Sequence, residues 1–205
     1  MDINLQLLRA VNALARSTPW LQPIMASYAN VIGIVVFTEL MFAGWWIGRK
    51  RSDPRPIAAA YWAPIGMLLA LAINEPITTF IAEPRPYIAH PDLGILGEHK
   101  LVFGFPSHHA VFVGAITASL FLVSRLLGFW ASLASLVMVF SRMYISAAYP
   151  SDVLAGLLLG ATVSLLGFWL VHGPLMRLLG AADPTVFRAL VTAGPRITGE
   201  QSRAR

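Results

Sequence analysis

The sequence predicts an all-α protein whose helices form a polytopic membrane bundle. Of its 205 residues, 57% are hydrophobic and 12% are charged, whereas a typical soluble domain carries about twice that charged fraction. Five apolar stretches approach the roughly 20 residues that a helix needs to cross a bilayer. We therefore expect five to six helices in one domain, and neither a soluble nor a nucleic-acid-binding protein, despite the net charge of +5. The absence of cysteine excludes disulfides and thiolate chemistry.

Residues 1–20 are expected to form a short amphipathic helix in the membrane interface. Its apolar residues recur at helical spacing, at Ile3, Leu7, Ala10, Val11 and Leu14. Arg9 and Arg16 interrupt the apolar pattern, which argues against a signal peptide. Pro19 and Pro23 are expected to break the chain after this helix.

The membrane spans follow as five apolar stretches. They cover residues 29–48, 57–82, 109–124, 126–149 and 153–171. Isolated charges inside these spans are Glu39 in the first, Glu75 in the second and Arg142 in the fourth. We assign residues 1–173 to one membrane domain and residues 174–205 to a basic cytoplasmic tail.

Basic residues set the expected orientation. They lie between the first two spans, in the turn between the third and fourth, and in the tail, at Arg49, Lys50, Arg51, Arg55, Arg125, Arg177, Arg188, Arg196, Arg203 and Arg205. If the spans alternate in direction, all three regions fall on one side, and the positive-inside rule makes that side cytoplasmic. The loop 83–107 and the start of the fifth span then face the extracytoplasmic side.

Polar and ionisable residues gather at that extracytoplasmic end, namely Arg85, Ser107, His108, His109, Arg142 and Asp152. Such residues within or beside a span are costly and commonly mark function. Arginine matches phosphate oxygens in bidentate geometry, and a helix start such as the one after Ser107 can hold an anion. A histidine can protonate a leaving oxygen, and a carboxylate can orient a second imidazole. The combination favours phosphoryl transfer.

Each of these residues alone also has a structural interpretation. Arg85 can anchor to lipid headgroups, and Ser107 can cap a helix. Arg142 can form an ion pair with Asp152 inside the bundle. It is their combination at one end that favours function.

The residues resemble the motifs of the type 2 phosphatidic acid phosphatase (PAP2) superfamily. The family motifs are Lys-x6-Arg-Pro, Pro-Ser-Gly-His and Ser-Arg-x5-His-x3-Asp. The corresponding residues are Arg85-Pro86, Pro106-Ser107-His108-His109, and Ser141-Arg142 with Asp152 at the matching spacing. The resemblance covers roughly residues 1–172.

The sequence departs from the family pattern at three positions. Thr78 replaces the lysine and His108 replaces the glycine. Both changes resemble variation within the undecaprenyl-diphosphate phosphatases of the bacitracin-resistance type. Ala148 stands where the family has its nucleophilic histidine, and alanine has no nucleophile, so the chain is expected to be catalytically impaired. We favour an introduced His-to-Ala substitution over a natural pseudoenzyme, because the surrounding motif residues are intact.

The resemblance implies a metal-independent phosphatase without a cofactor. Its implied substrate is undecaprenyl diphosphate, or another polyprenyl diphosphate or phospholipid, at the outer face of a bacterial inner membrane. His109 would protonate the leaving oxygen, and Asp152 would orient a histidine at position 148. The phosphate would be bound by Arg85, Ser107, His108 and Arg142. Supporting positions would be Thr78, Glu75 and Glu39, where both carboxylates also have a structural explanation.

Other functions stay open at this point. One is a broader lipid phosphatase that acts on phosphatidic acid or phosphatidylglycerophosphate. Another is a non-catalytic protein that binds or flips lipid phosphates, and a third is a structural scaffold in the membrane. The sequence does not indicate an oligomeric state.

Overall fold

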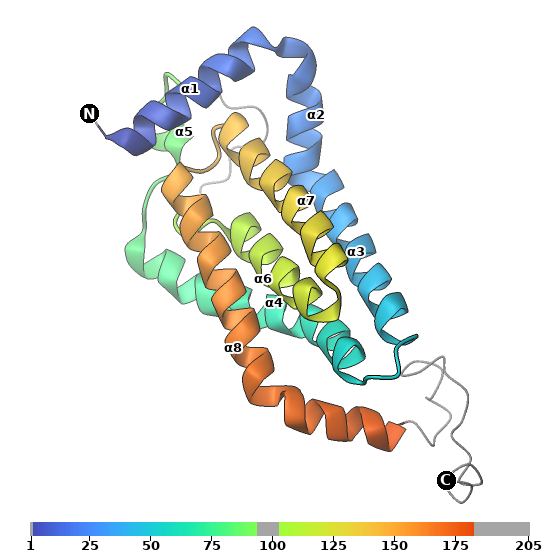
Figure 1. The fold of residues 1–205 in the computed structure, drawn as a ribbon. Coiled ribbons are helices and arrows are strands. Elements are labelled where there is room, and N and C mark those ends of the chain that lie inside the picture. Colours follow the sequence, from blue (N-terminus) through green and yellow to red (C-terminus); the bar gives the residue numbers. More distant parts are fainter. Residues whose placement is uncertain (1, 94–102, 183–205) are drawn as a thin grey trace, which may run out of the picture.

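The computed structural model describes residues 2–93 and 103–182, and every regular element in these ranges is helical (Figure 1). The helices are α1 (Ile3–Ser17), α2 (Gln22–Ser27), α3 (Gly33–Gly48), α4 (Arg55–Ile81), α5 (Pro86–Ala89), α6 (His108–Val123), α7 (Arg125–Tyr144) and α8 (Pro150–Ala182). A 3-10 turn (Pro19–Leu21) precedes α2, and a π-helical turn (Tyr28–Ile32) joins α2 to α3. The predicted all-α bundle is confirmed.

Four helical segments of the described ranges are long and apolar enough to cross a membrane, namely Pro19–Gly48, Arg55–Ala89, Arg125–Tyr144 and Pro150–Leu179. The predicted third span is the shorter helix α6, whose 16 residues extend over roughly 24 Å. It packs against α4, α7 and α8, whereas α4 and α8 expose large apolar side chains such as Phe80 (90%) and Trp169 (69%). The chain is thus a multi-pass membrane protein in which α6 is an inner helix.

The first span begins at Pro19 rather than at residue 29. Pro19 and Pro23 each occupy the first turn of a helical segment. A proline there loses no backbone hydrogen bond and its φ suits a helix. These prolines therefore start the next helical segments, and the chain turns at Thr18, which caps the end of α1.

Helix α7, which corresponds to the predicted fourth span, ends at Tyr144, so the predicted extension of this span to residue 149 is wrong. Ser146 has a left-handed backbone with φ of 59°. The N–H groups of Ser146 and Ala147 donate to the carbonyl oxygens of Met143 and Arg142, each at 2.9 Å. This pair of bonds is a Schellman motif, which closes a helix and redirects the chain. Ala148 consequently lies in a turn and not in a helix.

Helix α8, which corresponds to the predicted fifth span, continues past residue 171 as far as Ala182. It contains Pro174, and its lower part bends away from the bundle in Figure 1, as prolines within helices commonly cause. The segment assigned to a tail therefore begins as helix. Residues 183–205 lie outside the described ranges.

Glycines bring α6 and α8 into close contact near their starts and middles. A Cβ atom added at Gly156 of α8 would lie 2.7 Å from the carbonyl oxygen of Ser107. One added at Gly114 of α6 would lie 2.6 Å from the carbonyl oxygen of Leu157. Small residues allow helix backbones to approach in this way. The packing fixes the start of α6 against α8.

Candidate active site

The candidate site lies at the end of the bundle where α4 and α7 end and where α6 and α8 begin (Figure 1). The N–H of Ser107 donates to the carbonyl oxygen of Asp152 at 3.1 Å, which joins the starts of α6 and α8. The N–H of Gly104 donates to the carbonyl oxygen of Glu83 at 2.8 Å, which ties the segment before α6 to the one after α4. The three predicted motifs therefore meet at one end.

Arg142, in the last turn of α7, is a buried cation without a carboxylate partner. It is 6% exposed, and its Nη1 donates to Oδ1 of Asn30 at 3.4 Å. Its Nε is buried and makes no hydrogen bond to a described residue. Within the described ranges it forms no ion pair, so the alternative of a structural pair with Asp152 is wrong. A buried guanidinium with unused donors is suited to an anionic ligand.

Asn30 is a residue of the candidate site that was not predicted from the sequence. It lies in the π-helical turn between α2 and α3, and π-turns within helices are frequent at functional sites. Its Nδ2 donates to the carbonyl oxygen of Ala26 at 2.9 Å, which orients Oδ1 towards Arg142. A polar amide inside an apolar stretch was the available signal.

Arg85 reaches the turn between α7 and α8. Its Nη1 donates to the carbonyl oxygen of Ala147 at 3.2 Å. A Cβ atom added at Gly104 would lie 3.4 Å from Cγ of Arg85 and 3.4 Å from Oδ2 of Asp152. The missing side chain at Gly104 thus leaves Arg85 and Asp152 room to converge.

Asp152 is fully buried and caps the start of α8. Its Oδ2 accepts the N–H of Tyr149 at 2.9 Å, and its Oδ1 accepts the hydroxyl of Ser151 at 3.2 Å. An acidic residue at the third helical position that reaches back to the capping residue forms half of a capping box. Asp152 therefore fixes the turn that carries Ala148.

Tyr149 closes this turn from the side of α1. It packs with Leu8 and Leu93 in a buried apolar cluster. Burial, followed by the charges of Glu83 and Asp152, raises the pKa of the Tyr149 phenol above its ordinary range. The phenol consequently stays protonated at neutral pH.

Ser107 precedes α6 as its capping residue, but its side chain makes no capping hydrogen bond. It is 5% exposed, and its main chain is held by Asp152 and by the N–H of Val111, which donates to the Ser107 carbonyl oxygen at 3.0 Å. The Ser107 hydroxyl therefore does not form the cap on α6 that the structural interpretation of this residue required. His109 lies half-buried in the first turn of α6, two residues further along.

His108 and Glu75 form a pair at the edge of the site. Nε2 of His108 lies 2.9 Å from Oε2 of Glu75, and their side chains are 28% and 70% exposed. The contact is an ion pair when the imidazole is protonated. His108 is therefore the partner of Glu75, whose contacts could not be predicted from the sequence.

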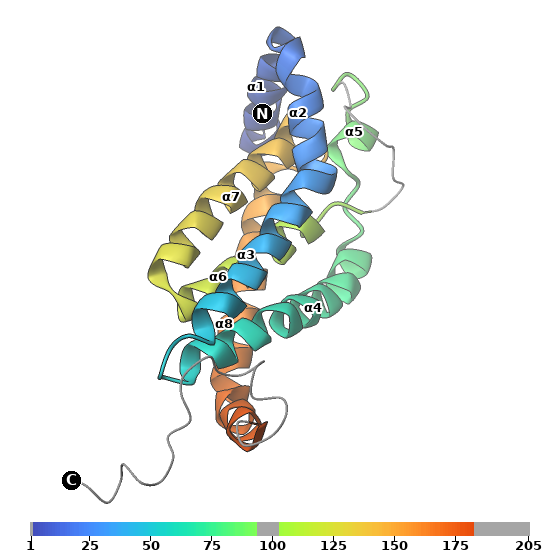
Figure 2. The same ribbon diagram turned by 90° about the vertical axis from the view of Figure 1, so that its right-hand side faces the viewer.

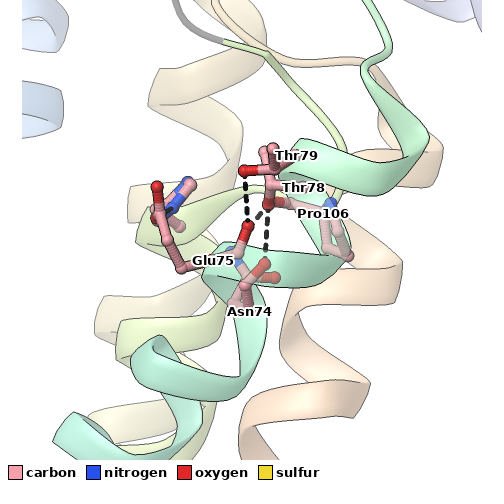
Figure 3. A network of polar contacts seen from close by, with 6 residues as sticks. Asn74, Glu75, Thr78, Thr79 and Pro106 are labelled. Carbon is pink, nitrogen blue, oxygen red and sulfur yellow. Dashed lines mark hydrogen bonds and ion pairs between the residues drawn. The ribbon is translucent and has the colours of Figure 1, made fainter.

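Thr78, at the position of the family lysine, is a neutral buried residue. The hydroxyls of Thr78 and Thr79 donate to the carbonyl oxygens of Asn74 and Glu75, each at 3.0 Å. Figure 3 shows these bonds as dashed lines. Nδ2 of Asn74 donates to the carbonyl oxygen of Pro106 at 3.3 Å, whereas its buried Oδ1 has no hydrogen-bond partner in the described ranges. Asn74, which was not predicted as a site residue from the sequence, thus links α4 to the second motif.

Ala148 is 1% exposed and packs with Ala110 and Val153 in the main core cluster. The packing around position 148, where the motif predicts a histidine, therefore fits a methyl group. A histidine there has to displace some of this packing, and overpacking of a core typically costs about 1–3 kcal/mol.

Glu39 is not part of this assembly. It lies exposed on α3 and makes no hydrogen bond or ion pair with a described residue. In the same ranges, no three histidine, aspartate or glutamate side chains are placed to share a metal ion.

Helix α1 lies across this end of the bundle (Figures 1 and 2) and is fastened to the turn before α8. Nδ2 of Asn12 donates to the Ser146 hydroxyl at 2.8 Å. The Thr18 hydroxyl lies 2.7 Å from the Tyr144 hydroxyl. These contacts were not predicted, because they join residues that lie 134 and 126 positions apart in the sequence.

The apolar stripe of α1 that contains Ile3, Leu7 and Leu14 faces away from the rest of the protein. Ile3, Leu7 and Leu14 are 72%, 52% and 44% exposed, whereas Leu8 and Ala15 are buried against the protein. An exposed apolar stripe on a helix is the face that would enter the membrane interface. The protein-facing stripe is the one that contains Asn12.

Comparison with known proteins shows the family of this chain. A model of the PAP2 superfamily matches residues 59–174, which is more than half of the sequence. The chain belongs to the PAP2 superfamily. Its motif positions Arg85, Ser107, His109, Arg142 and Asp152 all lie within the matched segment.

Individual relatives agree with this assignment to a family of membrane phosphatases. The chain is 28% identical to undecaprenyl-diphosphatase BcrC of Bacillus subtilis, over 81% of this chain and 83% of that protein. It is 27% identical to the bacitracin transport permease protein BcrC of Bacillus licheniformis, over 82% and 80% of the two chains. The crystal structure of the first transmembrane PAP2-type phosphatidylglycerolphosphate phosphatase from Bacillus subtilis matches 82% of this chain and 87% of its own, with a TM-score of 0.56 and 21% identity. This last likeness supports the PAP2 fold alone.

Proposed function

We propose that this protein, with a histidine at position 148, is a membrane lipid-diphosphate phosphatase that converts undecaprenyl diphosphate to undecaprenyl phosphate. The observation that carries the proposal is Arg142, a buried guanidinium without a carboxylate at the meeting point of the PAP2 motifs. The substrate is proposed from the similarity to undecaprenyl-diphosphatase BcrC. With Ala148 in place, the chain binds its substrate and does not hydrolyse it.

The proposed reaction has two steps. The imidazole at position 148 attacks the terminal phosphorus, a P–N bond forms, and the P–O bond to the lipid phosphate breaks while His109 protonates the leaving oxygen. Water then attacks the phosphorus of the phosphohistidine, a new P–O bond forms while the P–N bond breaks to release inorganic phosphate, and His109 takes the proton of the water. Arg85 and Arg142 stabilise the transferred oxygens, which needs no metal ion. Asp152 orients the attacking imidazole.

We place this site at the extracytoplasmic face of a bacterial inner membrane. The support is the charge pattern, because the opposite end carries Arg51, Arg55 and Arg125. The chain has no cysteine, so single cysteines report sidedness directly. Ile88→Cys, at an exposed position of α5, is expected to react with a membrane-impermeant maleimide in intact cells. Ser52→Cys, in the connection before α4, is expected to react only after lysis, and the reverse pattern would overturn the orientation.

The decisive experiment restores the nucleophile. Purified Ala148→His protein is expected to release phosphate from undecaprenyl diphosphate at least roughly a thousandfold faster than the present chain. Ala148→Gln is the matched control, because it adds a side chain of similar size without a nucleophile. Thermal unfolding of both variants shows whether the larger side chain is accommodated.

The outcomes separate the alternatives. Faster release from phosphatidic acid or phosphatidylglycerophosphate than from undecaprenyl diphosphate would favour a broader lipid phosphatase. A folded but inactive Ala148→His protein that still binds lipid phosphate would favour a carrier, a role in line with the transport name of one relative. Unchanged lipid-phosphate binding after Arg142→Gln would contradict both and favour a scaffold.

We attribute Ala148 to an introduced substitution, because Arg142, His109 and Asp152 are retained around it. A natural gene with an alanine codon at this position would contradict this attribution. The protein would then be a pseudoenzyme that binds lipid phosphate.

A further inference from the structure

A polar hollow lies at the end of the bundle opposite to the candidate site. Its volume is about 490 Å³. The walls come from the connection between α3 and α4, the start of α4, the end of α6 and the start of α7, and these segments lie side by side in both ribbon views (Figures 1 and 2). Because α4 and α7 end at the candidate site and begin here, the two places are separated by the length of the helices.

The hollow is positively charged. Arg51, Arg55 and Arg125 line it together with a single carboxylate, Asp53. Oδ1 of Asp53 accepts the backbone N–H of Arg55 at 2.9 Å, so this carboxylate caps the start of α4. None of the three guanidinium groups forms an ion pair with a residue in the described ranges. The lining therefore carries a net charge of +2, from three arginines and one aspartate.

The start of α7 adds to this positive potential. Ser124 precedes α7 and makes no side-chain capping bond. The first N–H of α7 that bonds back is that of Gly128, which donates to the carbonyl oxygen of Ser124 at 2.9 Å. The earlier amide groups of α7 therefore have no acceptor within the helix, and the positive end of the helix dipole faces the hollow.

An apolar strip adjoins the charged lining. Phe121, Leu122 and Leu126 line the same hollow and are 45%, 36% and 67% exposed. A soluble phosphate makes no use of such a strip, whereas an acyl chain does. The neighbouring arrangement of arginines and exposed apolar side chains matches a lipid that carries a phosphate headgroup.

We propose that this hollow binds the phosphate headgroup of an anionic phospholipid, with an acyl chain along Phe121, Leu122 and Leu126. The headgroup contacts are Arg51, Arg55 and Arg125 and the amide groups at the start of α7. By the orientation proposed above, the lipid belongs to the cytoplasmic leaflet, where basic pockets between helices attract anionic headgroups. The site is independent of hydrolysis and of the residue at position 148.

The test measures lipid binding to the full chain, delipidated in detergent and with Ala148 retained, by native mass spectrometry. The ligands are phosphatidylglycerol, phosphatidylcholine and inorganic phosphate. The background carries Arg85→Gln and Arg142→Gln, so that binding at the candidate active site does not contribute. We expect phosphatidylglycerol to bind at least roughly tenfold more tightly than phosphatidylcholine.

Two double variants locate the binding. Arg55→Gln with Arg125→Gln removes two charges from the hollow and is expected to weaken phosphatidylglycerol binding roughly tenfold or more. Arg49→Gln with Lys50→Gln removes two charges from the same end, but these side chains stack on Trp45 and Trp46 and do not line the hollow. This control is expected to change binding less than threefold.

Three results would overturn the proposal. Equal loss in the two double variants would indicate general surface charge rather than a site. Inorganic phosphate that displaces phosphatidylglycerol would indicate a soluble anion site. Equal binding of phosphatidylglycerol and phosphatidylcholine would show that the hollow does not recognise an anionic headgroup.

Discussion

Asn4 and Ser151 hold each other by two hydrogen bonds although 147 positions separate them in the sequence. Nδ2 of Asn4 donates to Oγ of Ser151 at 2.7 Å, and the backbone N–H of Ser151 donates to Oδ1 of Asn4 at 3.1 Å. The Ser151 hydroxyl in turn donates to Oδ1 of Asp152 at 3.2 Å. Through this one hydroxyl, helix α1 is connected to a carboxylate of the candidate active site. The position of α1 and the position of Asp152 therefore depend on each other.

Removing the Asn4 amide is expected to loosen α1. Asn4→Ala deletes both bonds to Ser151, and each such bond contributes about 0.5–1.5 kcal/mol. We expect faster amide hydrogen exchange in α1 and at the start of α8. Gln6→Ala is the matched control, because Gln6 is exposed on the same helix. Equal exchange in the two variants would show that the pair does not hold α1.

Giving Arg142 a resident carboxylate is expected to weaken anion binding. In Asn30→Asp, a carboxylate replaces the amide oxygen that lies 3.4 Å from Nη1 of Arg142. A hydrogen bond to a charged group contributes about 1.5–3 kcal/mol, so lipid-phosphate affinity should fall by roughly tenfold or more. Asn30→Ala, which adds no charge, is expected to retain most of the affinity. Titration of both variants with a lipid phosphate checks this, and similar affinities would contradict it.

A methyl group at Gly156 is expected to displace Ser107. The added Cβ atom would lie 2.7 Å from the Ser107 carbonyl oxygen, and such overpacking typically costs about 1–3 kcal/mol. Gly156→Ala should lower the thermal unfolding midpoint and weaken lipid-phosphate binding together. Gly173→Ala, on the same helix with open space around it, should be neutral or slightly stabilising, because alanine favours helices. A Gly156→Ala protein as stable as Gly173→Ala would show that α6 can shift without cost.

Two substitutions at Asp152 are expected to separate its structural role from its proposed catalytic role. Asp152→Asn retains an oxygen for the N–H of Tyr149, which Asp152 accepts at 2.9 Å, so its stability should stay near that of the parent. Asp152→Ala leaves that amide without its partner, which costs about 1–3 kcal/mol. Thermal unfolding measures this difference in the present chain. In the Ala148→His background both variants are expected to lose activity, and an active Asp152→Asn protein would contradict the orienting role.

Much of the fold was predictable, because its signals are local in the chain. Apolar runs identify membrane helices, and single charges such as Arg142 stand out against them. The end of α7 was not predictable in this way. Ile145, Ala147 and Ala148 continue the apolar run with only Ser146 between them. The helix stops because Ser146 adopts a left-handed backbone while its hydroxyl accepts a hydrogen bond from Asn12 of α1.

The sequence by itself determined the helical membrane class and the motif residues, because hydropathy and spacing are properties of one continuous segment. It also predicts that Ala148 stands where the family has a nucleophilic histidine, because Ala148 can be compared directly with the spacing of Arg142 and Asp152. The tertiary structure decided the partners of these residues. Arg142 contacts Asn30 and not Asp152, because the packing of α7 against the π-helical turn sets which groups can meet. Contacts between segments so far apart in the chain have no local signal, and only the packed bundle selects them.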